Sequence, residues 1–325
     1  MELDLKLAQL FLARHNFHDC HITKIAGDAS FRSYYRVMAK QSNHDQNYIL
    51  MFAPRQHEDI KPFVKIDNIL LENGFSAPQI IAKDDDVSFI LLEDFGDQTY
   101  NRFLQQNLSS ELKIYQRACD VLVELHKISL TNYQIAKYNN AVLYREVALF
   151  IDWYLPYKGY KISNQQIRDY KNYWFELFDK LNKANQVLVL RDYHADNLMI
   201  LNDRISVKAV GLLDFQDALI GSNAYDLVSL LEDARREIED VNRKKLFDYF
   251  VSQANYDYQE FLNDYEIISL QRNIKILGIF ARLFMRDGKK QYLNYLPRVE
   301  NFVKKRIAET TLINQEFKGF LNHYL

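Results

Sequence analysis

Short hydrophobic runs rich in β-branched and aromatic residues follow one another in the first part of the chain, with polar turns between them. Such runs predict β-strands, and they lie at residues 21–26, 33–39, 47–53, 79–82 and 88–93. The polar residues 40–46 predict a hairpin loop between the second and third strands. Residues 59–74 instead repeat apolar residues at helical spacing and end at Gly74, which predicts a helix inserted into a sheet of about five strands.

The pattern changes after residues 93–100. Residues 109–128 carry apolar residues at helical spacing behind a serine cap and an early glutamate, which predicts an amphipathic helix. Most of the chain beyond it is also helical in pattern. We therefore expect an α+β fold with two lobes, a small β-rich lobe at residues 1–94 and a larger helical lobe at residues 95–325, joined by a short hinge.

Composition and charge narrow the classes of function. The 325 residues carry a net charge of −2, so bulk electrostatics gives no reason to expect nucleic acid or a membrane as a partner. No stretch approaches the roughly 18 apolar residues of a membrane span, and the charged N-terminus is typical of an amphipathic helix rather than a signal peptide. Cys20 and Cys119 lie far apart, so we expect free thiols and a cytoplasmic protein.

Acidic and amide side chains follow the strand-like run at residues 186–190. The sequence RDYHADN places Asp192 and Asn197 five residues apart on one polar turn, and Asp214 ends the later apolar run VGLLD. Pairing of these runs would bring the three side chains together. Each alone is an ordinary turn residue, but their joint spacing beside buried runs favours a function.

These residue types match what phosphoryl transfer from a nucleotide requires. One carboxylate orients the attacking hydroxyl and accepts its proton, a role that suits Asp192. A carboxylate and an amide oxygen hold Mg²⁺ against the phosphates, which suits Asp214 and Asn197. The expected cofactors are therefore a nucleotide and Mg²⁺, and the expected partner of this monomer is a small molecule.

The same motifs resemble those of protein-kinase-like enzymes, and most closely the aminoglycoside phosphotransferase and choline kinase family. The resemblance is carried by D-x-x-x-x-N, by DFQDALIGSNAYDL and by VELH, and it covers residues 5–310. It implies a two-lobed protein-kinase-like fold with ATP bound between the lobes. It also implies that Asp226 supports the catalytic loop, and that Glu93 and Phe95 in LLEDFGD belong to the hinge on which adenine stacks.

A narrower resemblance lies in GDASFRSYYRV, residues 27–37. This segment is similar to the nucleotide loop of the anomeric kinases of N-acetylmuramate and N-acetylglucosamine, which serve peptidoglycan recycling. The resemblance implies that backbone amides of Ala29, Ser30 and Phe31 bind phosphate oxygens. It also makes Arg32 the candidate for the phosphate-binding cation.

The chain departs from the family pattern at two positions. Leu190 replaces a histidine that usually has a structural role, and Met51 stands where the phosphate-binding lysine usually lies. These departures keep open a pseudokinase that serves as an interaction module, although the intact Asp192, Asn197 and Asp214 argue against it. An aminoglycoside- or choline-type small-molecule kinase is the other alternative.

Three further polar residues are candidates for substrate binding. His194 is equally consistent with an exposed turn. Asp217, three residues after Asp214, would face the same cleft, which favours a sugar hydroxyl as its partner over a simple turn cap. Asp196 is the third candidate. The aromatic residues of segment 144–160 could stack on a sugar, although aromatic stripes at helical spacing more often belong to a core.

Overall fold

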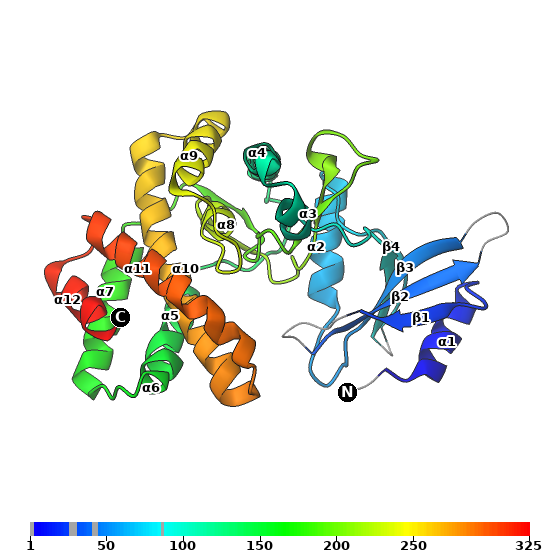
Figure 1. Ribbon diagram of the computed structural model, residues 1–325, viewed down its shortest axis with the longest axis horizontal. Coiled ribbons are helices and arrows are strands. Elements are labelled where there is room, and N and C mark those ends of the chain that lie inside the picture. Colours follow the sequence, from blue (N-terminus) through cyan, green and yellow to red (C-terminus); the bar gives the residue numbers. More distant parts are fainter. Residues whose placement is uncertain (1–2, 26–30, 41–44, 86–87) are drawn as a thin grey trace. The chain divides into compact units, whose positions relative to one another are not determined.

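The computed structural model describes residues 3–25, 31–40, 45–85 and 88–325 (Figure 1). The chain divides into two compact units. The first contains Met1–Phe103 and Asp196–Asp217, and the second contains Leu104–Ala195 and Ala218–Leu325. This division follows compactness alone, so the boundary between lobes at residues 94 and 95 stays a prediction.

The first unit is built on an antiparallel sheet with the strand order β1-β2-β3-β5-β4, which confirms the expected five strands. The strands are β1 (His21–Lys24), β2 (Ser33–Lys40), β3 (Asp45–Phe52), β4 (Ile80–Asp84) and β5 (Phe89–Glu93). Residues 41–44 of the expected hairpin loop lie outside the described residues. The register pairs Tyr34 with Met51, and Met51 in turn with Ile90.

One face of this sheet is covered by the N-terminal helix. Helix α1 (Leu5–Arg14) begins at the capping residue Asp4 and packs Phe11 and Leu12 into a core with Val37 and Leu50. Because successive strand side chains point to opposite faces, the neighbouring positions, Tyr34 and Arg36 on β2 and Met51 on β3, lie on the other face.

Helix α2 (Lys61–Glu72) matches the helix expected at residues 59–74 and ends before Gly74, whose φ of 82° suits glycine. Its residue Asp67 is fully buried, and neither of its carboxylate oxygens has a hydrogen-bond partner in the described part of the chain. Desolvation, with a smaller contribution from Glu93, raises the pKa of Asp67 to about 7.

A second hairpin completes the first unit. Strands β7 (Leu198–Ile200) and β8 (Val210–Leu212) pair with each other. Bridges join Gly211 to Ser76 and Met199 to Thr99, so this hairpin is fastened to segments on either side of β4 and β5. A Cβ at Gly211 would lie 2.7 Å from the ring of Phe95, which explains why only glycine fits there.

The second unit is mainly helical and contains one short antiparallel pair, β6 (Gln186–Val189) with β9 (Leu219–Ser222). Its longer helices are α4 (Glu111–Leu125), α5 (Asn140–Leu149), α7 (Asn164–Phe178), α8 (Tyr225–Leu231), α9 (Asp240–Ala254), α10 (Tyr258–Asp287), α11 (Leu296–Glu309) and α12 (Gln315–Tyr324). Helix α10 is buried along most of its length. Gly278 allows it to approach α5 closely, because a Cβ there would lie 2.3 Å from the carbonyl carbon of Leu149. Among the described helices, none combines enough length with enough apolar character to span a membrane.

The structure tests two local predictions, the helix at residues 109–128 and the role of the aromatic segment 144–160. The helix expected at residues 109–128 is α4, but Ser110 makes no side-chain cap because a 3₁₀ turn, Leu108–Ser110, leads directly into the helix. In the aromatic segment 144–160, Phe150 and Tyr154 are fully buried and stack at 5.0 Å. These two rings belong to the core.

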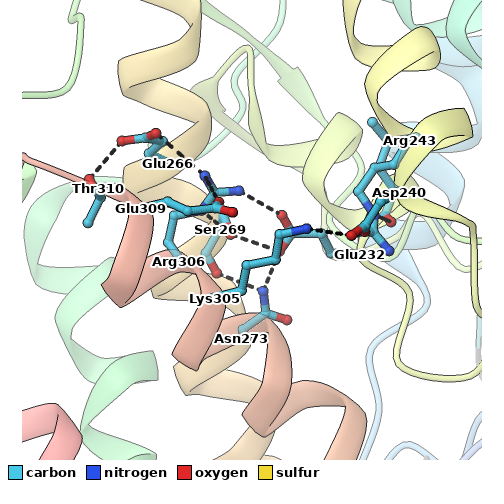
Figure 2. A network of polar contacts seen from close by, with 11 residues as sticks. Glu232, Asp240, Arg243, Glu266, Ser269, Asn273, Lys305, Arg306, Glu309 and Thr310 are labelled. Carbon is cyan, nitrogen blue, oxygen red and sulfur yellow. Dashed lines mark hydrogen bonds and ion pairs between the residues drawn. The ribbon is translucent and has the colours of Figure 1, made fainter.

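A buried ionic network joins α11 to α10 and to the end of α8, as Figure 2 shows. The Arg306 guanidinium lies 3.2 Å from Glu232 and donates to Ser269 at 3.1 Å. Glu232 is 3% exposed. Lys305, next to Arg306 on α11, instead pairs with the exposed Asp240 at 2.7 Å.

We expect Arg306→Ala to lower the free energy of unfolding by about 3–5 kcal/mol, because it leaves the Glu232 carboxylate buried without its cation. The matched change Lys305→Ala, which removes an exposed pair, is expected to cost less than about 1 kcal/mol. Urea unfolding of the two variants checks this, and equal losses would contradict it.

We expect Asp67→Asn to stabilise the protein increasingly as the pH rises from 5 to 8. The folded-state pKa of Asp67 lies above the ordinary value of about 4, so the stability that its protonated form provides is present at low pH and is lost as the pH passes about 7. Urea unfolding at pH 5 and pH 8 measures the difference. Glu72→Gln, an exposed change on the same helix, is the control, and parallel curves for wild type and Asp67→Asn would show the expectation to be wrong.

Candidate active site

The turn after β6 is held by one buried carboxylate. Asp226, at the start of α8, accepts hydrogen bonds from the backbone N–H of Leu190 at 2.7 Å and of Arg191 at 2.8 Å. Arg191 has a φ of 73°, an uncommon conformation for a residue other than glycine. Burial raises the pKa of Asp226 to about 7, although the two backbone bonds oppose this. Asp226 therefore supports the turn that leads to Asp192, and the catalytic role of that loop stays a prediction.

Asp192 follows directly on this turn. Desolvation alone would raise its pKa, but attraction to the charges of Lys275, Arg272 and Arg191 outweighs it and holds the pKa of Asp192 below its ordinary value. The next residue, Tyr193, is buried and donates to the carbonyl of Ala118 at 2.9 Å. The loop is thus attached to α8 on one side and to α4 on the other.

Glu146 on α5 balances two cations near this loop. Its carboxylate pairs with Lys275 of α10 at 3.0 Å and with Arg191. Gln271 donates to the same carboxylate at 3.1 Å. The hydroxyl of Tyr138 is a further donor to it. Lys275 also attracts Asp192, the candidate for the catalytic base. By pairing with Lys275, Glu146 reduces the positive charge that acts on Asp192.

Asn197 and Asp214 meet in the first unit. The β7–β8 hairpin places them opposite each other, and the backbone N–H of Leu213 donates to the carbonyl of Asn197 at 3.0 Å. The amide nitrogen of Asn197 lies 3.5 Å from one oxygen of Asp214, while Gln216 donates to the other oxygen at 2.7 Å. Asp214 has a φ of 57°, a strained backbone of the kind that collects at functional sites.

These donors fit Mg²⁺. The carboxylate of Asp214 and the amide oxygen of Asn197 are hard oxygen ligands, and Mg²⁺ is usually held by one or two carboxylates together with substrate phosphates and water. Among the described residues, no group of three His, Cys, Asp or Glu side chains forms a complete protein site. A magnesium ion here would therefore complete its coordination with phosphate oxygens and water.

The hinge candidates are firmly held. Glu93 pairs with Arg204 and accepts from the backbone N–H of Gln79 at 3.3 Å. Phe95 packs on Gly211 with the Arg204 guanidinium 5.2 Å from its ring centroid. The carboxylate of Glu93 thus serves the hinge, and nucleotide contacts of Glu93 and Phe95 stay predictions.

Arg36 holds the hinge from the sheet side. It reaches Asp94 at 2.6 Å and Asp97 at 3.0 Å. Hydrogen bonds to these two carboxylates raise the pKa of Arg36 above its ordinary value. Between the two acids, the backbone N–H of Gly96 donates to Asp94 at 2.8 Å.

The nucleotide-loop candidates are described only in part, since Ala29 and Ser30 lie outside the described residues. The ring of Phe31 is exposed and stacks on His57 with centroids 4.5 Å apart. Arg32 pairs with Glu58 at 2.9 Å.

The substrate candidates have different environments. His194 is 4% exposed, so it is not an exposed turn residue, and its Nε2 lies 3.3 Å from a guanidinium nitrogen of Arg235. Desolvation and Arg235 lower the pKa of His194. Asp196, in the first unit, accepts from Asn101 at 2.8 Å, and Asp217 is exposed.

Sequence reasoning missed Glu146, Lys275, Glu58 and Arg36. A signal existed for the first two, because each is a charged residue within an apolar helical run. Buried charges are usually paired. No local pattern reveals Glu58, whose partner Arg32 lies 26 residues earlier in the chain.

A family model described as the phosphotransferase enzyme family matches residues 21–260. The chain belongs to this phosphotransferase family. A member from Pseudomonas aeruginosa, named N-acetylmuramate/N-acetylglucosamine kinase, is 32% identical over 316 residues, which cover 94% of this chain and 90% of that protein. A protein of the same name from Neisseria meningitidis is 30% identical, with 95% and 93% covered. The phosphotransferase family and these kinase-named relatives make the chain a kinase enzyme.

Solved structures of the phosphotransferase fold confirm the architecture. An ethanolamine kinase from Plasmodium vivax matches with a TM-score of 0.65 and 13% identity, covering 97% of this chain and 89% of that chain. ADP-bound aminoglycoside phosphotransferase APH(2'')-Ib matches with a TM-score of 0.61 and 13% identity, covering 94% and 99%. At these identities the likeness concerns the fold, and it confirms the protein-kinase-like fold that the motifs implied.

We expect Glu146→Gln to lower kcat at least about tenfold, because two buried cations lose their shared counter-charge and the loop that carries Asp192 loses its attachment to α5. Adding Lys275→Met to this variant removes one of the unbalanced cations and should recover part of the loss. Steady-state kinetics of the two variants, with the exposed change Glu124→Gln as control, measures the effect. A double variant no better than Glu146→Gln would contradict the charge-balance explanation.

Proposed function

We propose that this phosphotransferase transfers the terminal phosphoryl group of ATP to the anomeric hydroxyl of an N-acetylated amino sugar, giving a sugar 1-phosphate. The observation that carries the proposal is the 32% identity over 94% of the chain to a protein named N-acetylmuramate/N-acetylglucosamine kinase. The ADP-bound fold relative supports an adenine nucleotide as the donor.

In this proposal the acceptor hydroxyl is oriented by Asp192, which accepts its proton as the O–P bond forms. A carboxylate with a lowered pKa is ionised at neutral pH and is ready to accept a hydrogen bond from the hydroxyl. The supports from Asp226 and Tyr193 hold the loop before substrate arrives, and such positioning supplies much of the rate in phosphoryl transfer.

Residues of the first unit bind the phosphates in this proposal. Asp214 and Asn197 would hold Mg²⁺, which when bound would neutralise charge on the phosphate oxygens. Gln216 keeps the Asp214 carboxylate in place through its hydrogen bond at 2.7 Å. Arg32 and the backbone of the nucleotide loop complete the phosphate contacts, and Glu93 and Phe95 form the adenine side.

Sugar recognition is proposed for His194, Asp196 and Asp217. A neutral imidazole can donate to one sugar hydroxyl, and carboxylates accept from others. The lowered pKa of His194 keeps it neutral at pH 7. Action in the cytoplasm as a monomer stays a prediction from the sequence.

We expect Asp192→Asn and Asp214→Asn each to lower kcat by about 10²–10⁴-fold, the range for loss of a positioned base or a charge-stabilising group. Asp217→Asn tests the weaker substrate role and should raise KM for the sugar with a smaller effect on kcat. Circular dichroism establishes that each variant is folded. Full activity of either Asp192→Asn or Asp214→Asn would overturn the assignment.

The deciding assay is ADP release with ATP and Mg²⁺ across N-acetylmuramate, N-acetylglucosamine, glucose, choline and kanamycin. Turnover of the N-acetylated sugars, with an acid-labile phosphate on the anomeric carbon, is the expected result. Turnover of choline or kanamycin alone would replace the proposed substrate with that of another small-molecule kinase. ATP binding without turnover of any acceptor would favour a pseudokinase.

A further inference from the structure

The sheet of the first unit lacks a cation at the position where the resemblance places one. Met51 is fully buried on β3, and its neighbours in the ladder are Tyr34 and Ile90. A thioether cannot balance phosphate charge. A kinase site that binds a triphosphate through Mg²⁺ alone would leave part of that charge without a protein counter-charge.

A different cation lies at the start of the neighbouring strand. Arg32 immediately precedes β2, whose Tyr34 pairs with Met51. The Arg32 and Glu58 side chains are only 9% and 16% exposed, and their charged groups are 2.9 Å apart. This enclosure distinguishes the pair from the exposed ion pairs that contribute little.

The acid of the pair is held by its own turn. The backbone N–H groups of His57 and Glu58 both donate to the carbonyl of Pro54, at 2.8 and 2.9 Å. The ring of His57 also stacks on Phe31. Two adjacent residues of the nucleotide loop, Phe31 and Arg32, therefore contact two adjacent residues of the turn that leads into α2.

The electrostatics connect Arg32 with the magnesium candidates. Desolvation alone would lower the pKa of Arg32, but the charges of Tyr34, Glu58 and Asp214 raise it above its ordinary value. Arg32 is thus close enough to Asp214 to interact with its charge. A phosphate group held by Mg²⁺ on Asp214 would lie within reach of the same field.

We propose that Arg32, oriented by Glu58, is the phosphate-binding cation of this site and replaces the lysine that β3 lacks, with Glu58 as its positioning residue. The inference rests on the proposed function for the identity of the ligand, a nucleoside triphosphate. Its physical basis is that a guanidinium has five N–H donors in a fixed plane. One edge can donate to Glu58 while another donates to a phosphate oxygen.

Nucleotide binding tests the proposal without any acceptor. Titration of the full chain with ATP, a non-hydrolysed ATP analogue and adenosine, each with Mg²⁺, gives the three dissociation constants. We expect Arg32→Met to weaken binding of ATP and of the analogue at least about tenfold and to leave adenosine unchanged, because adenosine has no phosphate. Arg32→Lys should recover part of the loss. Arg14→Met, which removes an exposed arginine of the same unit, is the matched control for net charge.

Glu58→Gln tests the positioning role. It should weaken ATP binding less than Arg32→Met does, and the double variant should bind no more weakly than Arg32→Met alone, because Glu58 acts through Arg32. Equal losses for ATP and adenosine would instead mean that the pair only holds the loop. ATP binding by Arg32→Met at the wild-type level would also overturn the proposal.

The same experiment separates the two proposals. Phosphate-selective loss in Arg32→Met, in a protein that phosphorylates none of the sugars, supports the role of Arg32 while the proposed function fails. Sugar turnover by an Arg32→Met protein with unchanged KM for ATP supports the function and overturns the role of Arg32. Glu58→Gln and Arg32→Lys each keep a polar side chain of similar length at the substituted position. These two variants therefore still test the proposal if Arg32→Met does not fold.

Discussion

The candidate site depends on the hydrogen bonds of one buried carboxylate. Asp226 accepts hydrogen bonds from the backbone N–H groups of Leu190 and Arg191, the two residues that follow the end of β6. Without that acceptor, these groups would be buried without partners, and Arg191 would have little reason to keep its left-handed conformation. The direction in which the chain leaves β6, and with it the position of Asp192, follows from this arrangement. Substituting Leu190 for the usual histidine does not disturb it, because the contact is made by the backbone.

Burying that acid has an electrostatic consequence for the whole second unit. Asp192 and Glu146 bring negative charge into this buried region, with a smaller share from Asp226, whose pKa is about 7. Positive charge comes to the same place from Arg191, Arg272 and Lys275. Isolated charges could not remain there. The helices α5, α8 and α10 are therefore joined by charge balance as well as by apolar packing. This explains why α10, otherwise a core helix, carries buried charged residues.

Features that depend on residues close together in the chain were predicted well from the sequence. The five strands and α2 follow from local periodicity, and the meeting of Asn197 with Asp214 follows from the pairing of two short apolar runs. The serine cap of α4 was wrong because an unforeseen 3₁₀ turn precedes the helix. The partners of Arg32, Arg36 and Arg191 could not be predicted, since they lie 26, 58 and 45 residues away in the chain. Long-range ion pairs leave no periodic trace, and an arginine on a strand has the same pattern whether it is paired or solvated.

The division of the chain has a consequence for how the protein is made. The first unit contains Asp196–Asp217 as well as the first 103 residues, and the backbone of Ser76 hydrogen-bonds to Leu212. The ribosome has to synthesise the intervening segment Leu104–Ala195, which belongs to the second unit, before the first unit can be completed. The five strands of the sheet are therefore already synthesised but lack the β7–β8 hairpin while α4, α5 and α7 emerge. During that interval the exposed sheet would be a natural substrate for chaperones.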